Sequence, residues 1–189
     1  MKHNNQSGKR QLIGITGEKG KGKTTLVHVL NFLLSINGYN ANVFNFADYI
    51  KQIARECFDV EIGNIHGKLS QEQRELLCKI GDALRSIDPN CLVKVIDRKI
   101  KQNQGFIIIG DVRLQREADM IKSQGGIIVR MQSHSFNRSE NYLQEHVTEK
   151  EIAGIQPDFE IVNDGTFADL VHEAKKVLRH LSPHHDWKG

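Results

Sequence analysis

One short glycine-rich segment constrains this chain more than any other feature. Residues 17–24 read GEKGKGKT and match the pattern G-x-x-x-x-G-K-[ST]. The segment follows a short apolar run, Gln11–Thr16, and precedes a helical pattern over residues 24–36. A surface turn rich in glycine and lysine would match this pattern only by accident, and the strand–loop–helix context argues against that alternative. We therefore expect a phosphate-binding loop, whose backbone N–H groups and following helix start attract anions.

The rest of the chain alternates strand and helix patterns. Strands are expected over residues 42–46, 106–111, 127–131 and 159–162, and helices over 48–58, 70–87, 89–104, 118–122 and 166–181. Such alternation is typical of βαβ units with a mostly parallel sheet. The predicted fold is a three-layer α/β fold of the P-loop NTPase type, with about five strands and helices on both faces.

Two helix starts and one helix face can be predicted in more detail. Ser70 with Gln73, and Thr166 with Asp169, have the spacing of helix caps. The core-facing stripe of the helix over residues 70–87 is expected to hold Leu76, Leu77, Ile80, Leu84 and Ile87.

No linker or internal repeat divides the chain. Residues 11–182 are expected to form a single domain, between polar ends at residues 1–10 and 183–189 that we expect to be flexible. The polar segment over about residues 132–147 has almost no core residues. It is interpreted as a lid that closes over a reaction site, although an ordinary loop would have the same composition.

Composition narrows the choice of function. Hydrophobic residues are 39% and charged residues 26% of the chain, which is typical of a globular protein. The net charge of +3 is too small to indicate a nucleic-acid partner, and no apolar run is long enough to span a membrane. The three cysteines lack a C-x-x-C spacing, so neither a disulfide framework nor a zinc site is expected, and the cytoplasm is the expected location.

Residues for binding ATP and Mg²⁺ cluster around the loop. The expected nucleotide contacts are Gly17, Glu18, Lys19, Gly20, Lys21, Gly22, Lys23, Thr24 and Thr25. Lys23 can reach the β- and γ-phosphates, and the Thr24 hydroxyl can ligate Mg²⁺. Asp111 ends an apolar strand and is expected as the second Mg²⁺ ligand, although an aspartate there could also cap a helix. Arg113 is the expected anion partner, with Arg116 a weaker candidate, although either could be a solvated charge at a helix start.

A second set of polar residues suits a phosphate-bearing acceptor. Asp48, at the predicted end of the second strand, can orient an acceptor group or can cap a helix. On the helix over residues 70–87, Arg74 and Arg85 share a stripe with Gly81 and can clamp a phosphate, or can be a solvated face. The expected acceptor contacts are Asp48, Lys51, Arg74, Arg85 and Arg113. A lid arginine, Arg130 or Arg138, is expected to neutralise charge during transfer, with Arg138 as the assigned catalytic residue.

An ordered set of motifs extends well beyond the loop. It comprises FAD at 46–48, IGDALR at 80–85, DP at 88–89, DVR at 111–113, EAD at 117–119, GG at 125–126, HVTE at 146–149 and NDGT at 163–166. With the phosphate-binding loop, this set resembles the bacteriophage-type deoxynucleoside monophosphate kinases. The set also resembles animal-type phosphomevalonate kinases and, more distantly, dephospho-coenzyme A kinases.

The resemblance implies transfer of the ATP γ-phosphoryl group to a deoxynucleoside monophosphate, with Asp111 and Arg113 facing the phosphates and Asp48 and Arg85 near the acceptor. The expected partner is a small-molecule substrate, and a homodimer is left open. If the source is viral, the expected location is the host cytoplasm. The role of residues 146–149 is also open, between a helix cap at Thr148 and a substrate contact. A P-loop ATPase or switch without an acceptor is the alternative of another class, although no Asn-Lys-x-Asp base-reading motif supports a GTPase.

Overall fold

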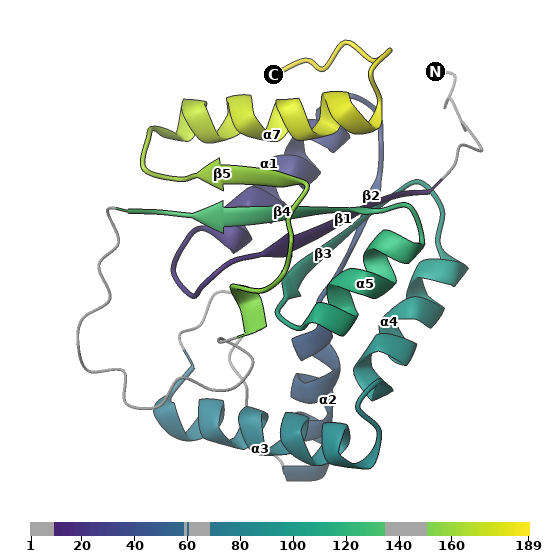
Figure 1. The fold of residues 1–189 in the computed structure, drawn as a ribbon, viewed down its shortest axis with the longest axis vertical. Coiled ribbons are helices and arrows are strands. Elements are labelled where there is room, and N and C mark those ends of the chain that lie inside the picture. The colour runs from purple at the N-terminus through teal and green to yellow at the C-terminus, as the bar shows by residue number, and fades with distance from the viewer. Residues whose placement is uncertain (1–9, 59, 61–68, 135–150) are drawn as a thin grey trace.

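The fold is built on a parallel sheet of five strands in the order β2-β3-β1-β4-β5 (Figure 1). A computed structural model describes residues 10–58, 60, 69–134 and 151–189. The strands are β1 (Gln11–Thr16), β2 (Ala41–Phe44), β3 (Phe106–Val112), β4 (Ile127–Gln132) and β5 (Phe159–Val162). Every neighbouring pair is parallel. The predicted α/β class and the five-stranded parallel sheet are therefore confirmed.

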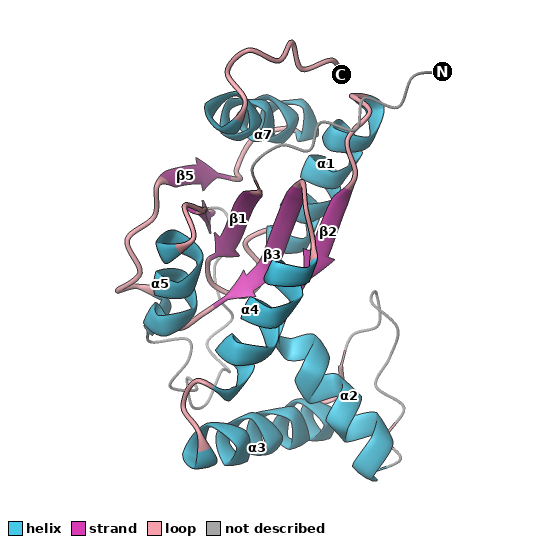
Figure 2. Ribbon diagram, turned by 90° about the vertical axis from the view of Figure 1, so that its right-hand side faces the viewer, coloured by secondary structure: helices cyan, strands magenta, loops and turns pink. Residues whose placement is uncertain are grey.

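Helices cover both faces of this sheet. On one face lie α1 (Lys23–Ile36) and α7 (Phe167–Leu181), and on the other lie α4 (Cys91–Gln102) and α5 (Gln115–Ser123) (Figure 1). Two further helices, α2 (Phe46–Phe58) and α3 (Gln71–Ile87), pack on each other. Figure 2 shows this pair beyond the ends to which the arrows of β1, β2 and β3 point. In the described part of the chain, no helix combines the length and the apolar character needed to cross a membrane.

The central strands separate two hydrophobic cores because alternate side chains point to opposite faces. In β1, Ile13 and Ile15 belong to the core under α1 and α7, while Leu12 belongs to the core under α4 and α5. β3 divides in the same way, with Ile108 on the first face and Ile107 on the second. Strands that are buried on both faces explain why these segments read as apolar runs rather than as alternating patterns.

The predicted helix caps are confirmed, but three helix positions differ from expectation. Ser70 and Thr166 each accept from the backbone N–H three residues later, and Gln73 and Asp169 complete the two boxes. Phe46, expected to end a strand, is a buried residue of α2. Helix α5 begins before the predicted segment, and α4 ends slightly earlier than predicted.

The predicted core stripe of α3 is wrong at its end. Ile87 is 85% exposed, whereas Ile80 is buried. Leu76, Leu77 and Leu84 are partly buried and pack against the core. Ile87 is the last residue of α3. Only the middle of α3 packs on its neighbours. The apolar spacing continues to Ile87, where α3 has no neighbouring surface among the described residues to bury the side chain.

The carboxyl-terminal segment, expected to be flexible, packs on the core. Trp187 is only 3% exposed and contacts the rings of Tyr39 and Phe106. His185 lies between Tyr39, whose hydroxyl is 3.2 Å from Nδ1, and Asn37, whose Oδ1 is 3.3 Å from Nε2. The polar, histidine-rich composition hides this docking, because Trp187 is the only buried residue within residues 183–189. Of the expected amino-terminal tail, residues 1–9 lie outside the described residues.

Candidate active site

The loop between β1 and α1, the predicted anion cradle, has a left-handed backbone at three glycines. Gly17, Gly20 and Gly22 have φ angles of 135°, 84° and 96°, which L-residues with side chains rarely adopt. A Cβ at Gly17 would lie 2.4 Å from the carbonyl oxygen of Met131, on β4. The first glycine is therefore required both by its conformation and by the close approach of a neighbouring strand. The observed strand–loop–helix arrangement is the predicted one.

Two lysines of the loop have different surroundings. The Lys23 ammonium donates to the carbonyl oxygens of Gly17 and Glu18 at 2.6 and 2.7 Å, so its side chain folds back over the loop. Lys21 donates to the carbonyl oxygen of Ser133 at 2.6 Å and thereby ties the loop to the residue that follows β4. Lys23 is thus placed over the cradle itself, while Lys21 connects the cradle to the segment that leads into the predicted lid.

Asp111 joins β3 to the start of α2. Its two carboxylate oxygens accept from the backbone N–H groups of Phe46 and Ala47, at 2.7 and 2.9 Å. Burial raises the pKa of Asp111. The two backbone hydrogen bonds and the nearby charge of Arg113 both oppose that rise. The aspartate therefore acts as a helix cap, the alternative left open by its sequence position. Since each carboxylate oxygen has a second lone pair, capping still leaves room for another ligand.

Asp48 lies in the first turn of α2 and not at the end of β2. It accepts from the Asn45 side chain at 2.9 Å and lies 3.6 Å from the Lys51 ammonium. Its charge raises the pKa of Asp111, so the two carboxylates are within electrostatic reach of each other. The start of α2 therefore brings Asp48 and Lys51 to the same edge of the sheet as Asp111.

Arg85, on α3, is held close to its own helix. A Cβ at Gly81 would lie 2.8 Å from an Arg85 Nη2 atom, so this glycine makes room for the arginine rather than for a ligand. The guanidinium is 3.0 Å from Asp82 and its side chain is 17% exposed. Arg74, also on α3, is half-buried. The two arginines of the predicted stripe, Arg74 and Arg85, are therefore both half-buried on α3.

Of the two candidate lid arginines, only Arg130 lies within the described residues. Arg130 lies on β4, where its guanidinium donates to the carbonyl oxygens of Ile152 and Ile155 and lies 3.4 Å from Glu160. It therefore anchors the segment after the predicted lid and is not a lid residue, which corrects the expectation for this position. Arg138 and residues 146–149 lie outside the described residues.

The sequence analysis missed the role of one buried acid. Glu117, on α5, is 3% exposed and accepts from the backbone N–H groups of Arg113 and Leu114 at 2.8 and 3.1 Å. The sequence signals are its place in the EAD motif at 117–119 and its position shortly after Arg113, and neither predicts its burial. Through these two hydrogen bonds, Glu117 fixes the backbone of Arg113 and Leu114 just before α5.

The described donor groups suit Mg²⁺ that is held mainly by ATP. Thr24 is exposed at the first turn of α1, directly after Lys23. Within residues 10–58, 60, 69–134 and 151–189, no three acidic, histidine or cysteine side chains form a cage for a metal ion. Mg²⁺ in phosphotransferases commonly takes one or two protein ligands together with phosphate oxygens and water. Thr24 and Asp111 fit that requirement.

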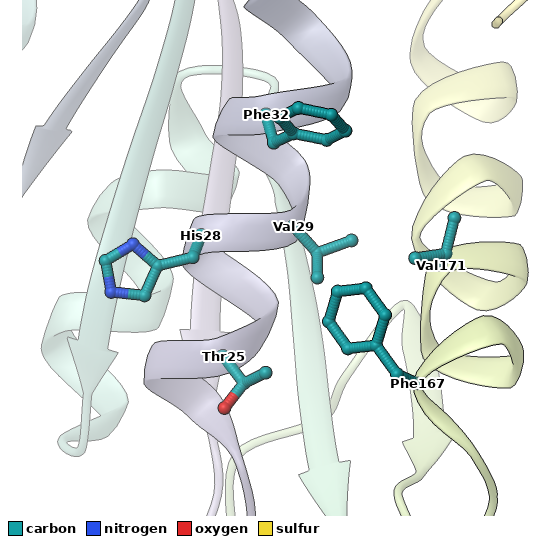
Figure 3. A pocket seen from close by; sticks show the side chains of 6 residues that line it. All are labelled: Thr25, His28, Val29, Phe32, Phe167 and Val171. Atoms are coloured by element: carbon teal, nitrogen blue, oxygen red, sulfur yellow. The ribbon is translucent and has the colours of Figure 1, made fainter. Parts of the chain in front are cut away.

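An apolar groove runs beside the loop between α1 and α7. It is lined by Thr25, His28, Val29, Phe32, Phe167 and Val171 (Figure 3). Phe32 and Phe167 are 61% and 66% exposed, and Figure 3 shows both rings at the groove. Thr25 directly follows Thr24, so the groove begins beside the predicted cradle.

Comparison with solved structures defines the class of the fold. Kti12 from Chaetomium thermophilum, solved with ADP-AlF3, has a TM-score of 0.51 at 12% identity, covering 90% of this chain and 99% of that one. A provisionally named kinase from Chloroflexus aurantiacus has a TM-score of 0.50 at 15% identity, covering 94% of this chain and 98% of that one. The fold is that of the P-loop kinases.

Sequence comparison points to one family within that class. The family model for deoxynucleotide monophosphate kinases matches residues 85–174. A protein of Acanthamoeba polyphaga mimivirus, provisionally named a deoxynucleotide monophosphate kinase, is 27% identical over 185 residues. That match covers 84% of this chain and 91% of the viral protein. The resemblance drawn from the motifs is confirmed, and these matches indicate an ATP-dependent phosphotransferase.

Proposed function

We propose that the protein transfers the γ-phosphoryl group of ATP to a deoxynucleoside monophosphate. The observation that carries this proposal is the meeting of two charged sets at one edge of the sheet. The phosphate cradle with Lys23 follows β1, while the Asp111–Arg113 segment ends the neighbouring strand β3. The family match over residues 85–174 includes that segment and Arg85.

Phosphoryl transfer needs alignment and charge neutralisation more than covalent chemistry by the protein. In the proposed reaction, the loop N–H groups bind the donor phosphates, and Lys23 exchanges its loop carbonyl partners for phosphate oxygens. Arg113 faces the transferring group, with Arg138 as the proposed lid contribution. Mg²⁺, held by Thr24, Asp111 and the nucleotide, would supply further neutralisation of phosphate charge. The acceptor phosphate is already anionic, so no strong general base is required.

The acceptor side is formed by α2 and α3. Asp48, Lys51, Arg74 and Arg85 are proposed to bind the nucleoside monophosphate. A guanidinium is suited to phosphate because it donates two parallel hydrogen bonds. Gly81 leaves room for Arg85 to lie against α3, so its head group is already confined before the acceptor arrives.

The groove between α1 and α7 supports ATP as the donor. Its lining is apolar and carries two exposed rings, which are suited to stacking with a nucleobase. A base attached to phosphates in the cradle would reach this groove past Thr25. Replacing Phe167 by Ala is therefore expected to raise the KM for ATP and to leave the KM for the acceptor within about twofold, as expected for separate sites.

An acceptor panel tests the proposed function. ADP release from ATP and Mg²⁺ is measured with dTMP, dGMP, dCMP, dAMP, the matching ribonucleotides, 5-phosphomevalonate and dephospho-coenzyme A. Dependence on one or more deoxynucleotides is expected, and the pattern would reveal the base preference. Dependence only on phosphomevalonate or dephospho-coenzyme A would replace the substrate class, and release without any acceptor would indicate an ATPase or switch.

A further inference from the structure

The turn between β5 and α7 lies against the loop that follows β1. Asn163 comes directly after β5, and its backbone N–H donates to the carbonyl oxygen of Gln132, at the end of β4, at 2.8 Å. Its side-chain Nδ2 donates to the carbonyl oxygen of Lys21 at 3.4 Å. Asn163 therefore connects the loop to the carboxyl ends of β4 and β5, although 142 residues separate it from Lys21.

Gly22 shows how closely the Asn163 side chain approaches the loop. A Cβ at Gly22 would lie 2.4 Å from Asn163 Nδ2. The φ of 96° at Gly22 also favours a residue without a side chain. The Asn163 amide thus occupies the space that a side chain at Gly22 would need, so the last glycine of the loop motif and Asn163 fit each other.

The contact with Asn163 gives a direction to the peptide group between Lys21 and Gly22. The carbonyl and the N–H of a planar trans peptide point in opposite directions. Because the Lys21 carbonyl oxygen accepts from Asn163, the Gly22 N–H points away from Asn163, toward the other side of the loop. Successive N–H groups on one side of such a loop form a concave site for an anion.

The side chain of Lys21 is held through the neighbouring residue of the same turn. The Lys21 ammonium donates to the carbonyl oxygen of Ser133 at 2.6 Å. The Ser133 hydroxyl donates to the Asp164 carboxylate at 2.6 Å, and the His134 backbone N–H donates to it at 2.8 Å. Asn163 therefore acts on the main chain of Lys21, while Asp164 supports the partner of its side chain.

We propose that Asn163 is a positioning residue for the donor phosphates: its amide holds the Lys21–Gly22 peptide so that the Gly22 N–H faces a phosphate oxygen of ATP. The proposal rests on the proposed function only in taking ATP as the phosphate donor. A donor group that already has the required direction needs no reorientation when the ligand binds. Loss of the Asn163 amide should therefore weaken the binding of polyphosphates and leave the acceptor site unaffected.

Asn163→Leu tests this proposal, because leucine has a similar size but no N–H donor. The Kd for ADP, measured by titration calorimetry with Mg²⁺ and no acceptor, is expected to rise about fivefold, the scale of one lost hydrogen bond. The KM for the acceptor should stay within about twofold, as expected for a separate site.

Asn103→Leu is the matched control. The Asn103 side chain also donates to a backbone carbonyl oxygen, that of Lys99, at 2.7 Å, but it lies at the end of α4, before β3 begins. Both the Kd for ADP and the acceptor KM of this variant should stay within about twofold of the wild-type values.

Inorganic tripolyphosphate separates an effect on the cradle from an effect on the base, since it has phosphates and no nucleoside. Its affinity is measured by displacement of ADP in the same titrations. Asn163→Leu should weaken tripolyphosphate by the same factor as ADP. Phe167→Ala, in the apolar groove, should leave the affinity for tripolyphosphate within about twofold. Weaker ADP binding with unchanged tripolyphosphate binding in Asn163→Leu would overturn the proposal, because Asn163 would then act on the nucleoside.

An unchanged Kd for ADP in folded Asn163→Leu would also overturn the proposal and leave Asn163 with a role only in the β5–α7 turn. Asn163→Ala, which removes the donor without adding bulk, provides the same test if the leucine variant folds poorly. If the wild type binds ADP but uses no acceptor, the proposed function fails while the titrations still test Asn163. If the wild type binds neither ADP nor tripolyphosphate, both proposals are wrong.

Discussion

At the scale of single residues, the site depends on charges held close to backbone groups. The Lys23 ammonium donates to two loop carbonyl oxygens. Asp111 and Glu117 each accept from two backbone N–H groups. These contacts hold the charged side chains near one edge of the sheet before any substrate is bound. Such preorganisation is the main contribution that a phosphotransferase can make to its reaction.

Lys23→Ala tests the assignment of the phosphate cradle. Loss of this ammonium is expected to reduce kcat by at least about 10²-fold, the scale seen when one contact to developing charge is deleted. Folding should be unaffected, because the side chain is partly exposed and lies over the loop, where its ammonium donates to two loop carbonyls. Steady-state ADP release provides the measurement, and Lys101→Ala on α4 is the matched control. Turnover close to that of the wild type would contradict the role of Lys23.

The raised pKa of Glu117 predicts a pH dependence of stability. Its carboxyl ionises near pH 4.5 in the unfolded chain and near 7 in the folded protein, so the folded state binds more protons between these values. The free energy of unfolding should therefore fall as pH rises through this window, by up to about 3 kcal/mol, since one pKa unit corresponds to about 1.4 kcal/mol.

Urea unfolding of the wild type and Glu117→Gln at several pH values gives the measurement. The difference between the two proteins isolates this group from Asp111, whose pKa is also raised. A constant difference between pH 4.5 and 7 would show that the Glu117 pKa is not raised in the folded state.

At the scale of elements, the loop, the β3 end and the α2 start form a connected unit. The loop packs under β4 at Gly17, and the Asp111 carboxylate fastens the end of β3 to α2. Much of this could be predicted from sequence, because the loop motif and the helix caps depend on neighbouring residues. The capping partner of Asp111 could not, because Phe46 and Ala47 lie 65 and 64 residues away along the chain.

Gly17→Ala tests how rigid this unit must be. An added Cβ would meet the carbonyl oxygen of Met131 at 2.4 Å, so β4 or the loop must move. Gly38→Ala is the matched control, because Gly38 has a φ of 82° but open space around it. Both variants should lose about 1 kcal/mol of stability from the strained φ. Only Gly17→Ala should lose ATP affinity, measured by titration calorimetry; equal affinities for the two variants would contradict the close-approach argument.

At the scale of the whole molecule, the two ends of the sheet have separate tasks. The groups that we propose for catalysis collect at the carboxyl ends of the strands, as ligand sites do in open α/β sheets. The carboxyl-terminal segment packs at the opposite end, where Trp187 contacts Phe106 at the start of β3. The alternation of strand and helix patterns predicted the layers of the fold. It did not predict the packing of the carboxyl-terminal segment, since a single aromatic residue within a polar segment has no periodicity.

Trp187→Ala separates the two ends. Removing this buried ring is expected to lower the free energy of unfolding by about 3–5 kcal/mol, the usual cost for a large aromatic residue in a core. The KM values for ATP and the acceptor should stay within about twofold at a temperature where the variant is folded, as expected for distant sites. Chemical denaturation and steady-state kinetics check the two parts. A selective loss of substrate affinity would show that the tail communicates with the site.

The most direct test of the central claim follows the fate of the γ-phosphoryl group. The protein is given ATP labelled in that group, Mg²⁺ and a mixture of deoxynucleoside monophosphates, and the products are separated by chromatography. The account predicts that the label appears in a deoxynucleoside diphosphate, in equal amount to the ADP formed, and that Lys23→Ala abolishes most of this transfer. Label released as inorganic phosphate at the same rate with and without acceptors would contradict it.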